Sequence, residues 1–475
     1  LAHILHRHEI PCVVFDRHTK EHIYETGRAG LFDHTSAMIV DQYDLSERIE
    51  SKEWRSAPMG RHKSCYFSRV EANGDKKVVE WSPVKMIEMD LKEKGEEVID
   101  MWNPLYPQTE LVLDMHNKAE REGINVRFGV QIDEVSGFEP GSSGPVEVKW
   151  RPSEDAPLET LKVSYVVGCG GFHDPVRKAM KEHDLFVEKS VDWGPITLGL
   201  FSDSIPSTTK IIYGHHPDGM GAHMIRTKTL SRYYLEVETD VSEENSSKDY
   251  DSSNHKEQVA RLEKIWTDEK IWEALKTRLG IPDLDTGVIT SKAFFRTQHY
   301  VVESMNIGKA CLSGDAAHSR PYLGARGANN AVQDSYVLAE LLVKAYEKGD
   351  SEFNNVDLSS YAEQRVPNLY ESARFTFDFY RMCFGSQHSD EKDRFQQAMA
   401  KPIFDDLWKS MEEMKAGKLK SLNVLAKWFS YCYVQPCSQA KNVNEWFDMT
   451  PAGKGVRQVK DAGVVVSADE SDDDY

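Results

Sequence analysis

The sequence has few of the features that define several common classes of protein. It contains only seven cysteines in 475 residues, with no C-x-x-C pair, which argues against a disulfide framework or a zinc site and suits a reducing cytoplasm. No apolar run approaches the length of a transmembrane helix, and no signal peptide is visible in these residues. Positive charge is also scarce, because 58 Lys and Arg stand against 77 Asp and Glu, for a net charge of -19. We therefore expect a cytoplasmic protein without a nucleic-acid partner and without stable insertion in a membrane.

Residues 310–346 carry the most informative pattern. Ala310-Cys311-Leu312 reads as a buried strand, Asp315 lies in an acidic turn, and a glycine-rich loop (324–330) leads into a stretch with the apolar spacing of a helix. Glycine lets the backbone approach a ligand, and the amides at the start of a helix favour negative charge. Asp315 is placed to accept a hydrogen bond from a sugar-like hydroxyl.

A second acidic strand end lies near the start of the chain. Residues 1–5 have a helical apolar face, and residues 10–17 read as a strand that ends in Asp16 and Arg17. In a dinucleotide-binding βαβ unit, such an acid binds the ribose of the adenosine half, although a surface strand end has the same pattern. The preceding strand and its G-x-G-x-x-G loop are missing, so we expect an N-terminally truncated chain.

The middle of the chain supplies a third segment of this kind. Residues 162–177 read as a strand, a glycine turn and a helix that starts at Pro175. His173 and Arg177 are candidate contacts of a pyridine nucleotide, and His173 taken alone is equally compatible with a structural histidine.

Together these segments resemble the group A FAD-dependent aromatic hydroxylases of the 4-hydroxybenzoate 3-monooxygenase type, in their fungal form. The resemblance continues through Thr26 to Leu31, Tyr106 to Leu111, Ile212 to Gly219 and Ser231 to Val237, and it reaches about Pro436. It implies FAD as cofactor, NADPH or NADH as co-substrate, and hydroxylation of a phenolic or amino aromatic acid by O2 through a flavin hydroperoxide. One departure is Gly170, which stands where the family has the Asp of its D-G motif.

The resemblance implies a role for individual residues, and no metal site. FAD contacts are expected from Asp16, Arg17, Arg28, Gln108, Asp315, Gly324, Gly327, Ala328 and Asn329. NAD(P)H contacts are expected from Arg28, His173 and Arg177. The substrate site is expected to contain Arg226, Tyr234, Met224 and Tyr322, with Tyr213 and Tyr433 handling the phenolic proton and Pro321 shaping the wall on the flavin side. Arg226 would clamp a carboxylate, while Met224 and Tyr322 replace a Ser and a Pro of the family.

The order of the motifs predicts an α/β fold in which a Rossmann-like FAD-binding domain (1–60, 105–185 and 290–357) is interleaved with a mixed β-sheet substrate domain. The substrate domain is expected to span 61–104 and 186–289. A C-terminal helical region (358–467), which would close over the pocket or form a homodimer contact, and an acidic tail (468–475) would follow.

Four alternative functions remain open at this point. The first is decarboxylative hydroxylation of the same acids at the carboxyl-bearing carbon, and the second is hydroxylation of a polyketide-like phenol. A flavin oxidase or dehydrogenase would need neither Arg226 nor the two tyrosines. Finally, Gly170 and the missing glycine loop are compatible with a non-catalytic remnant.

Overall fold

Seven strands form the largest sheet of the computed structural model. Their order is β14 (Ile289–Phe295), β10 (Thr197–Ser202), β13 (Ser231–Glu236), β12 (Gly221–Ile225), β11 (Ile211–His215), β2 (Cys65–Val70) and β3 (Lys76–Trp81). Neighbouring strands are antiparallel, except that β11 and β2 are parallel. The structure describes residues 1–25, 30–45, 47–49, 64–70, 74–98, 101, 103–153, 155–191, 196–237, 255–295, 299–347, 358–383 and 391–434.

Both faces of this sheet are covered, because side chains alternate along each strand. On β13, Tyr233 and Leu235 face one way and pack with Trp272 and Leu275 of α9 (Asp268–Leu279), next to α8 (His255–Ile265). Tyr234 faces the other way, into an aromatic cluster that includes residues of the C-terminal helices. The second face therefore holds the polar aromatic side chains that the sequence assigns to the substrate.

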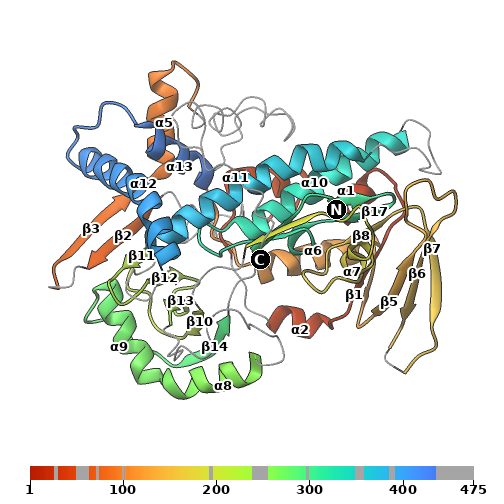
Figure 1. Cartoon of the computed structure of the whole chain (residues 1–475), viewed down its shortest axis with the longest axis horizontal. Helices are drawn as coiled ribbons and strands as arrows, with labels where there is room; N and C mark the ends of the chain where they lie inside the picture. The colour runs from red at the N-terminus through yellow and green to blue at the C-terminus, as the bar shows by residue number, and fades with distance from the viewer. Residues whose placement is uncertain are drawn as a thin grey trace.

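Smaller sheets and helices form the other half of the molecule (Figure 1). Strand β1 (Val13–Asp16) pairs in parallel with β4 (Asn125–Phe128). Strand β8 (Val166–Gly168) pairs in parallel with β17 (Ala310–Leu312), and β16 (Asn306–Ile307) pairs antiparallel with β17 on its other side. The remaining strands are β5 (Gln131–Ser136), β6 (Val146–Arg151), β7 (Glu159–Val163), β9 (Glu188–Val191), β15 (His299–Val302) and β18 (His318–Ser319). The helices are α1 (Ala2–Arg7), α2 (Lys20–Glu25), α3 (His34–Gln42), α6 (Gln108–Glu122) and α7 (Pro175–Lys181).

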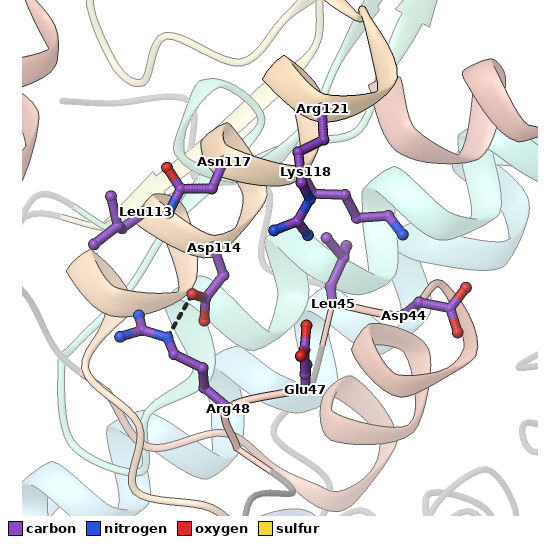
Figure 2. Close-up of a pocket in the computed structure, with 9 residues that line it drawn as sticks. All are labelled: Asp44, Leu45, Glu47, Arg48, Leu113, Asp114, Asn117, Lys118 and Arg121. Atoms are coloured by element: carbon purple, nitrogen blue, oxygen red, sulfur yellow. Dashed lines mark hydrogen bonds and ion pairs between the residues drawn. The ribbon is translucent and has the colours of Figure 1, made fainter.

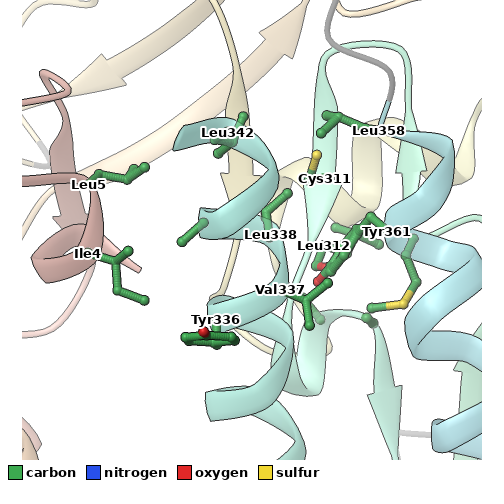
Figure 3. Close-up of a cluster of buried hydrophobic side chains, with 14 of the residues drawn as sticks. Ile4, Leu5, Cys311, Leu312, Tyr336, Val337, Leu338, Leu342, Leu358 and Tyr361 are labelled. Atoms are coloured by element: carbon green, nitrogen blue, oxygen red, sulfur yellow. The ribbon is translucent and has the colours of Figure 1, made fainter. Parts of the chain in front are cut away.

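The long helix α10 (Arg326–Glu347) organises the core of this half. Figure 3 shows Ile4 and Leu5 of α1 on one side of it and Leu312 of β17 on the other. Leu338 of α10 lies between them and is fully buried. The apolar period that predicted this helix therefore reflects burial along its length.

The C-terminal helices are α11 (Ser359–Cys383), α12 (Glu391–Lys415) and α13 (Val424–Val434). They pack with α5 (Pro83–Glu93) over the aromatic face of the large sheet, and α10 and α11 run alongside each other in Figure 1. The Asp90 carboxylate of α5 holds α13 by accepting hydrogen bonds from Tyr431 (2.8 Å) and Lys427 (2.7 Å).

The mixed α/β fold confirms the predicted fold class. The segment predicted as strand, acidic turn, glycine loop and helix contains two further elements. The 3-10 helix η3 (Gly314–Ala316) and strand β18 lie between β17 and α10. Strand β14 spans the predicted boundary at residue 289, and the domain limits stay a prediction. The predicted acidic tail lies outside the described residues. Within the described residues, we find no helix whose length and apolarity would let it cross a membrane.

Candidate active site

Two tyrosines meet on the aromatic face of the large sheet. Tyr213 of β11 and Tyr433 of α13 are each 1% exposed, and their hydroxyls are hydrogen-bonded to one another. Phe379 packs against Tyr213 at 4.8 Å, and Trp81 packs against Tyr433 at 4.7 Å between ring centroids. Burial raises the pKa of both tyrosines well above its ordinary value, so both hydroxyls are protonated and able to donate at neutral pH.

A buried arginine lies close to this pair. Arg226, just after β12, is 3% exposed, donates from Nη1 to the Ile225 carbonyl at 3.2 Å, and has no ion-pair partner among the described residues. Its Nε also has no hydrogen-bond partner there. Burial lowers the pKa of Arg226 to about 10, opposed by the nearby Tyr234 and Tyr213, so the guanidinium is still charged at neutral pH. Such a cation requires an anionic or hydrogen-bonding partner to offset its desolvation.

Sequence reasoning missed a second arginine on this face. Arg232 opposes Met224 in the register of β12 and β13, and its guanidinium lies 4.8 Å from the Tyr234 ring centroid and 4.5 Å from that of Phe201. The strand alternation that marked Tyr234 also places Arg232 on the same side, so the signal was present in the sequence.

The two predicted substrate positions that depart from the family pattern, Met224 and Tyr322, are both on this face. The Tyr322 ring stacks on Tyr234 at 4.4 Å with an interplanar angle of 18°, and it meets the edges of Phe295 and Tyr380. Met224 is half-buried and packs against the same aromatic cluster. Pro321, directly before Tyr322, is buried. Tyr322 thus adds an aromatic surface beside the predicted substrate residues.

Asp315 follows the buried strand β17 and is exposed. The Tyr300 hydroxyl donates to the Asp315 carbonyl and fixes the backbone there. A Cβ atom on Gly171 would lie 4.0 Å from the Asp315 Cβ, so the glycine turn after β8 and the acidic turn after β17 are brought together. Because these two strands are parallel neighbours, both turns lie at the same edge of the sheet, where ligands of α/β folds bind.

The start of α10 combines tight packing with open space. Gly324 has a φ of +78°, and a Cβ there would lie 2.5 Å from the Phe375 ring, so only glycine fits. A Cβ on Gly327 would meet nothing within 4 Å, and Gly327 and Ala328 are half-buried. The Asn329 side chain accepts a hydrogen bond from the Asp33 amide (3.0 Å), so this side chain is used within the protein. Any contact of Asn329 with a cofactor would come from its backbone.

Two buried ion pairs fix this helix. Arg326 donates to the Asp33 carboxylate (2.9 Å) and to the Tyr433 carbonyl (3.1 Å), which ties the start of α10 to α13. Asp334 accepts hydrogen bonds from Arg365 (2.7 Å) and from His318 (2.6 Å), and these contacts lower the pKa of Asp334 despite its burial. No local pattern predicts the contact of Arg326 with the Tyr433 carbonyl, because the two residues are far apart in the chain.

A neighbouring carboxylate lies against the glycine at position 170. Asp174 caps α7 by accepting hydrogen bonds from the amides of Val176 and Arg177, and its other oxygen accepts one from the Gly170 amide at 2.6 Å. A Cβ at Gly170 would lie 2.8 Å from that oxygen. A larger residue at position 170 would therefore collide with the Asp174 carboxylate. An Asp before a Pro at a helix start is a recognisable cap, which was the available signal.

The other residues predicted to contact FAD or NAD(P)H differ in exposure and in their contacts within the protein. Asp16 ends β1 and accepts a hydrogen bond from the His18 amide (2.8 Å), while Arg17 and His173 are exposed, and Gln108 begins α6. Arg177, in contrast, is 2% exposed, donates to the Ala316 carbonyl at 3.0 Å and pairs with Glu188. Its guanidinium is therefore used within the protein, and its NAD(P)H role stays a prediction. Arg28 lies outside the described residues.

A separate surface cavity of about 290 Å³ lies between α6 and the segment after α3 (Figure 2). Arg48 crosses it to reach Asp114 at 2.6 Å and Glu110 at 2.7 Å. The cavity is lined by Asp44, Leu45, Glu47, Arg48, Leu113, Asp114, Asn117, Lys118 and Arg121, none of which the sequence assigned to the site.

The residues at the sheet edge fit FAD. The exposed Asp315 can accept from a ribityl hydroxyl, and the open space at Gly327 leaves the first amides of α10 accessible to electron-rich ring atoms. Tyr213 lies on a strand of the separate seven-stranded sheet, and Arg226 directly follows another of its strands. The aromatic face of that sheet contacts the loop before α10 through the stack of Tyr234 on Tyr322.

Comparisons with known proteins agree with this geometry. The FAD binding domain family matches residues 1–375. The p-hydroxybenzoate hydroxylase of Acinetobacter baylyi is 24% identical over 383 residues, which cover 79% of this chain and 81% of that protein. The tetracenomycin A2 monooxygenase-dioxygenase of Streptomyces glaucescens is 24% identical over 270 residues, covering 53% and 42% of the two chains.

A solved structure shares the fold. The ternary complex of aklavinone-11 hydroxylase with FAD and aklavinone superposes with a TM-score of 0.59 at 16% identity, covering 81% of this chain and 66% of that one. The family match spans most of the chain, and relatives along its length are monooxygenases or hydroxylases. The chain therefore belongs to the FAD binding domain family and is an FAD-dependent monooxygenase of the aromatic and polyketide hydroxylase type.

Proposed function

We propose that this protein hydroxylates a phenolic or amino aromatic acid, using FAD, NAD(P)H and O2. The observation that carries the proposal is the buried guanidinium of Arg226, which has no acidic partner among the described residues and lies near the hydroxyls of Tyr213 and Tyr234. A carboxylate is the natural partner of this planar fork. Its relative from Acinetobacter is named for an aromatic acid of this kind.

Each side chain has a distinct task in this reaction. Bound FAD would supply the redox chemistry, by accepting a hydride and activating O2. Arg226 orients the ring by its carboxylate. The Tyr213 hydroxyl donates a hydrogen bond to the phenolic oxygen, which favours the ionised phenol and makes the ring more nucleophilic. Tyr433 then supports Tyr213 as its hydrogen-bond partner, and the surrounding aromatic rings exclude water.

A second candidate is hydroxylation of a polyketide-like phenol that carries no carboxylate. Tyr322 favours it, because its stack with Tyr234 offers a flat aromatic surface to a fused ring system. The relative from Streptomyces glaucescens is named as a tetracenomycin A2 monooxygenase-dioxygenase.

A substrate panel separates the candidates. We expect 4-hydroxybenzoate or 4-aminobenzoate analogues to accelerate NADPH or NADH oxidation and to gain one oxygen atom by mass spectrometry. Loss of carbon dioxide with gain of oxygen would indicate decarboxylative hydroxylation. Turnover of carboxylate-free polycyclic phenols alone would contradict the aromatic acid and support the second candidate. Hydrogen peroxide as the sole product with every compound would indicate an oxidase.

A further inference from the structure

The loop between β18 and α10 contains a buried cation that the proposed function does not use. Arg320 is 5% exposed, and its Nε, Nη1 and Nη2 have no hydrogen-bond partner among the described residues. Other buried arginines nearby are satisfied, since Arg326 binds Asp33 and Arg365 binds Asp334. A guanidinium has five N–H donors, so leaving it buried without acceptors is strongly unfavourable. The position implies an acceptor that the described residues do not provide.

The surroundings of Arg320 indicate where this acceptor lies. Burial lowers the pKa of Arg320 to about 10, with opposing contributions from Asp334 and Asp315, so the side chain is charged at neutral pH. Asp334 is already bound by His318, Arg365 and the Gly314 amide. Asp315 is exposed at the sheet edge. The guanidinium thus lies near Asp315 and near Arg326, the first residue of α10, which are the two places where flavin contacts are expected.

We propose that Arg320 binds the pyrimidine edge of FAD and stabilises the negative charge that the ring gains on reduction. The inference rests on the proposed use of FAD. The carbonyl and ring-nitrogen acceptors of a flavin pyrimidine match the planar fork of a guanidinium. The positive charge of a buried guanidinium attracts the negative charge of the reduced ring more strongly than it would in water. Arg320 therefore raises the reduction potential of the bound flavin.

The test compares Arg320→Met, which removes the charge, with Arg320→Lys, which keeps it without the fork. Arg151→Met is the control, because it removes a partly exposed arginine on β6 that pairs with Asp133 at 2.9 Å and has no proposed role in the site. Without FAD, the Arg320→Met variant should unfold at the same temperature as the wild type or higher, because an unpaired buried charge has been replaced by an apolar chain. Arg365→Met should unfold at a lower temperature, because it removes the arginine that pairs with the buried Asp334 carboxylate at 2.7 Å.

With FAD bound, Arg320→Met should stabilise the reduced flavin about tenfold less, which for a two-electron couple is a midpoint potential about 30 mV more negative. Arg320→Lys should recover part of the shift, and Arg151→Met should show none. An unchanged midpoint potential in a flavin-loaded Arg320→Met variant would overturn the proposed contact of Arg320 with the flavin but not the proposed function. A loss of apoprotein stability like that of Arg365→Met would have the same consequence. A wild-type protein that takes up no FAD would overturn the proposed function as well.

Discussion

In the proposed function, Arg226 determines which substrates the site can hold. Arg226→Ala should weaken binding of an aromatic acid by about 2 to 5 kcal/mol, because the carboxylate loses a charge-assisted partner in a desolvated pocket. Arg226→Lys should recover only part of this loss, since a point charge cannot form the bidentate contact. Equilibrium titration of the acid against the flavin absorbance measures both effects. The partly exposed control Arg151→Ala should bind normally, and unaltered benzoate affinity in Arg226→Ala would show that the acid binds elsewhere.

In the proposed function, Tyr213 acts on the end of the substrate opposite the carboxylate. Tyr213→Phe should raise the pKa of the bound phenol, because the phenolate loses a hydrogen-bond donor, and should slow hydroxylation about 10²-fold or more. Affinity should change less, since Arg226 is intact. A pH titration of the bound ligand by its phenolate absorbance measures the pKa directly.

The matched control for Tyr213 is Tyr66→Phe. Tyr66 lies on the neighbouring strand β2 and packs against the opposite face of the sheet, so its variant should leave the phenol pKa unchanged. Equal phenol pKa values in Tyr213→Phe and the wild type would remove Tyr213 from the proton path.

Among the helices, α13 is held at the site by an acidic contact. Burial opposes ionisation of Asp90, but hydrogen bonds from Lys427, Lys94 and Tyr431 outweigh it and keep the pKa of Asp90 below its ordinary value of 3.8. A carboxyl with a lowered folded-state pKa contributes stability that is complete above its unfolded pKa and is lost as the pH falls through the folded pKa. We therefore expect α13 to loosen on acidification below about pH 4.

Hydrogen exchange of the α13 amides measures this loosening. Asp90→Asn should exchange faster at neutral pH and should lose the acid dependence that the wild type shows. Asp405→Asn removes an exposed carboxylate on α12 that pairs with Lys401, and it should exchange like the wild type. Identical acid profiles for Asp90→Asn and the wild type would exclude Asp90 as the group responsible.

At the scale of the whole molecule, cofactor binding and stability are linked. FAD at 100 times its dissociation constant should add about 2.7 kcal/mol to the free energy of unfolding. Asp315→Asn should weaken FAD binding and reduce this gain without lowering the stability of the apoprotein, because Asp315 is exposed. Thermal unfolding with and without FAD measures both quantities, with Asp133→Asn as an exposed control. A gain equal to that of the wild type would mean that Asp315 does not contact the flavin.

Local patterns predicted the parts of this molecule that local physics determines. The apolar period of α10 and the buried strand β17 were visible because each buries its side chains along a regular face. Short elements such as η3 and β18 were not, since two or three residues carry no period.

Contacts between distant residues were accessible only through family resemblance or not at all. The resemblance placed Tyr213 and Tyr433 in one site, although their hydrogen bond joins strand β11, in the middle of the chain, to helix α13, the last helix of the described residues. It gave no indication that Asp174 satisfies the amide of Gly170, or that Arg320 is buried without a partner, because both depend on how this particular chain packs.

The most direct test of the whole account is the source of the oxygen in the product. The FAD-loaded protein would be incubated with NADPH or NADH and a panel of aromatic acids under ¹⁸O2, and the products analysed by mass spectrometry. We predict that a phenolic or amino aromatic acid gains one labelled oxygen atom on its ring, and that unlabelled O2 in labelled water gives no label. Reduced cofactor consumed with all O2 recovered as hydrogen peroxide, or label derived from water, would contradict the account.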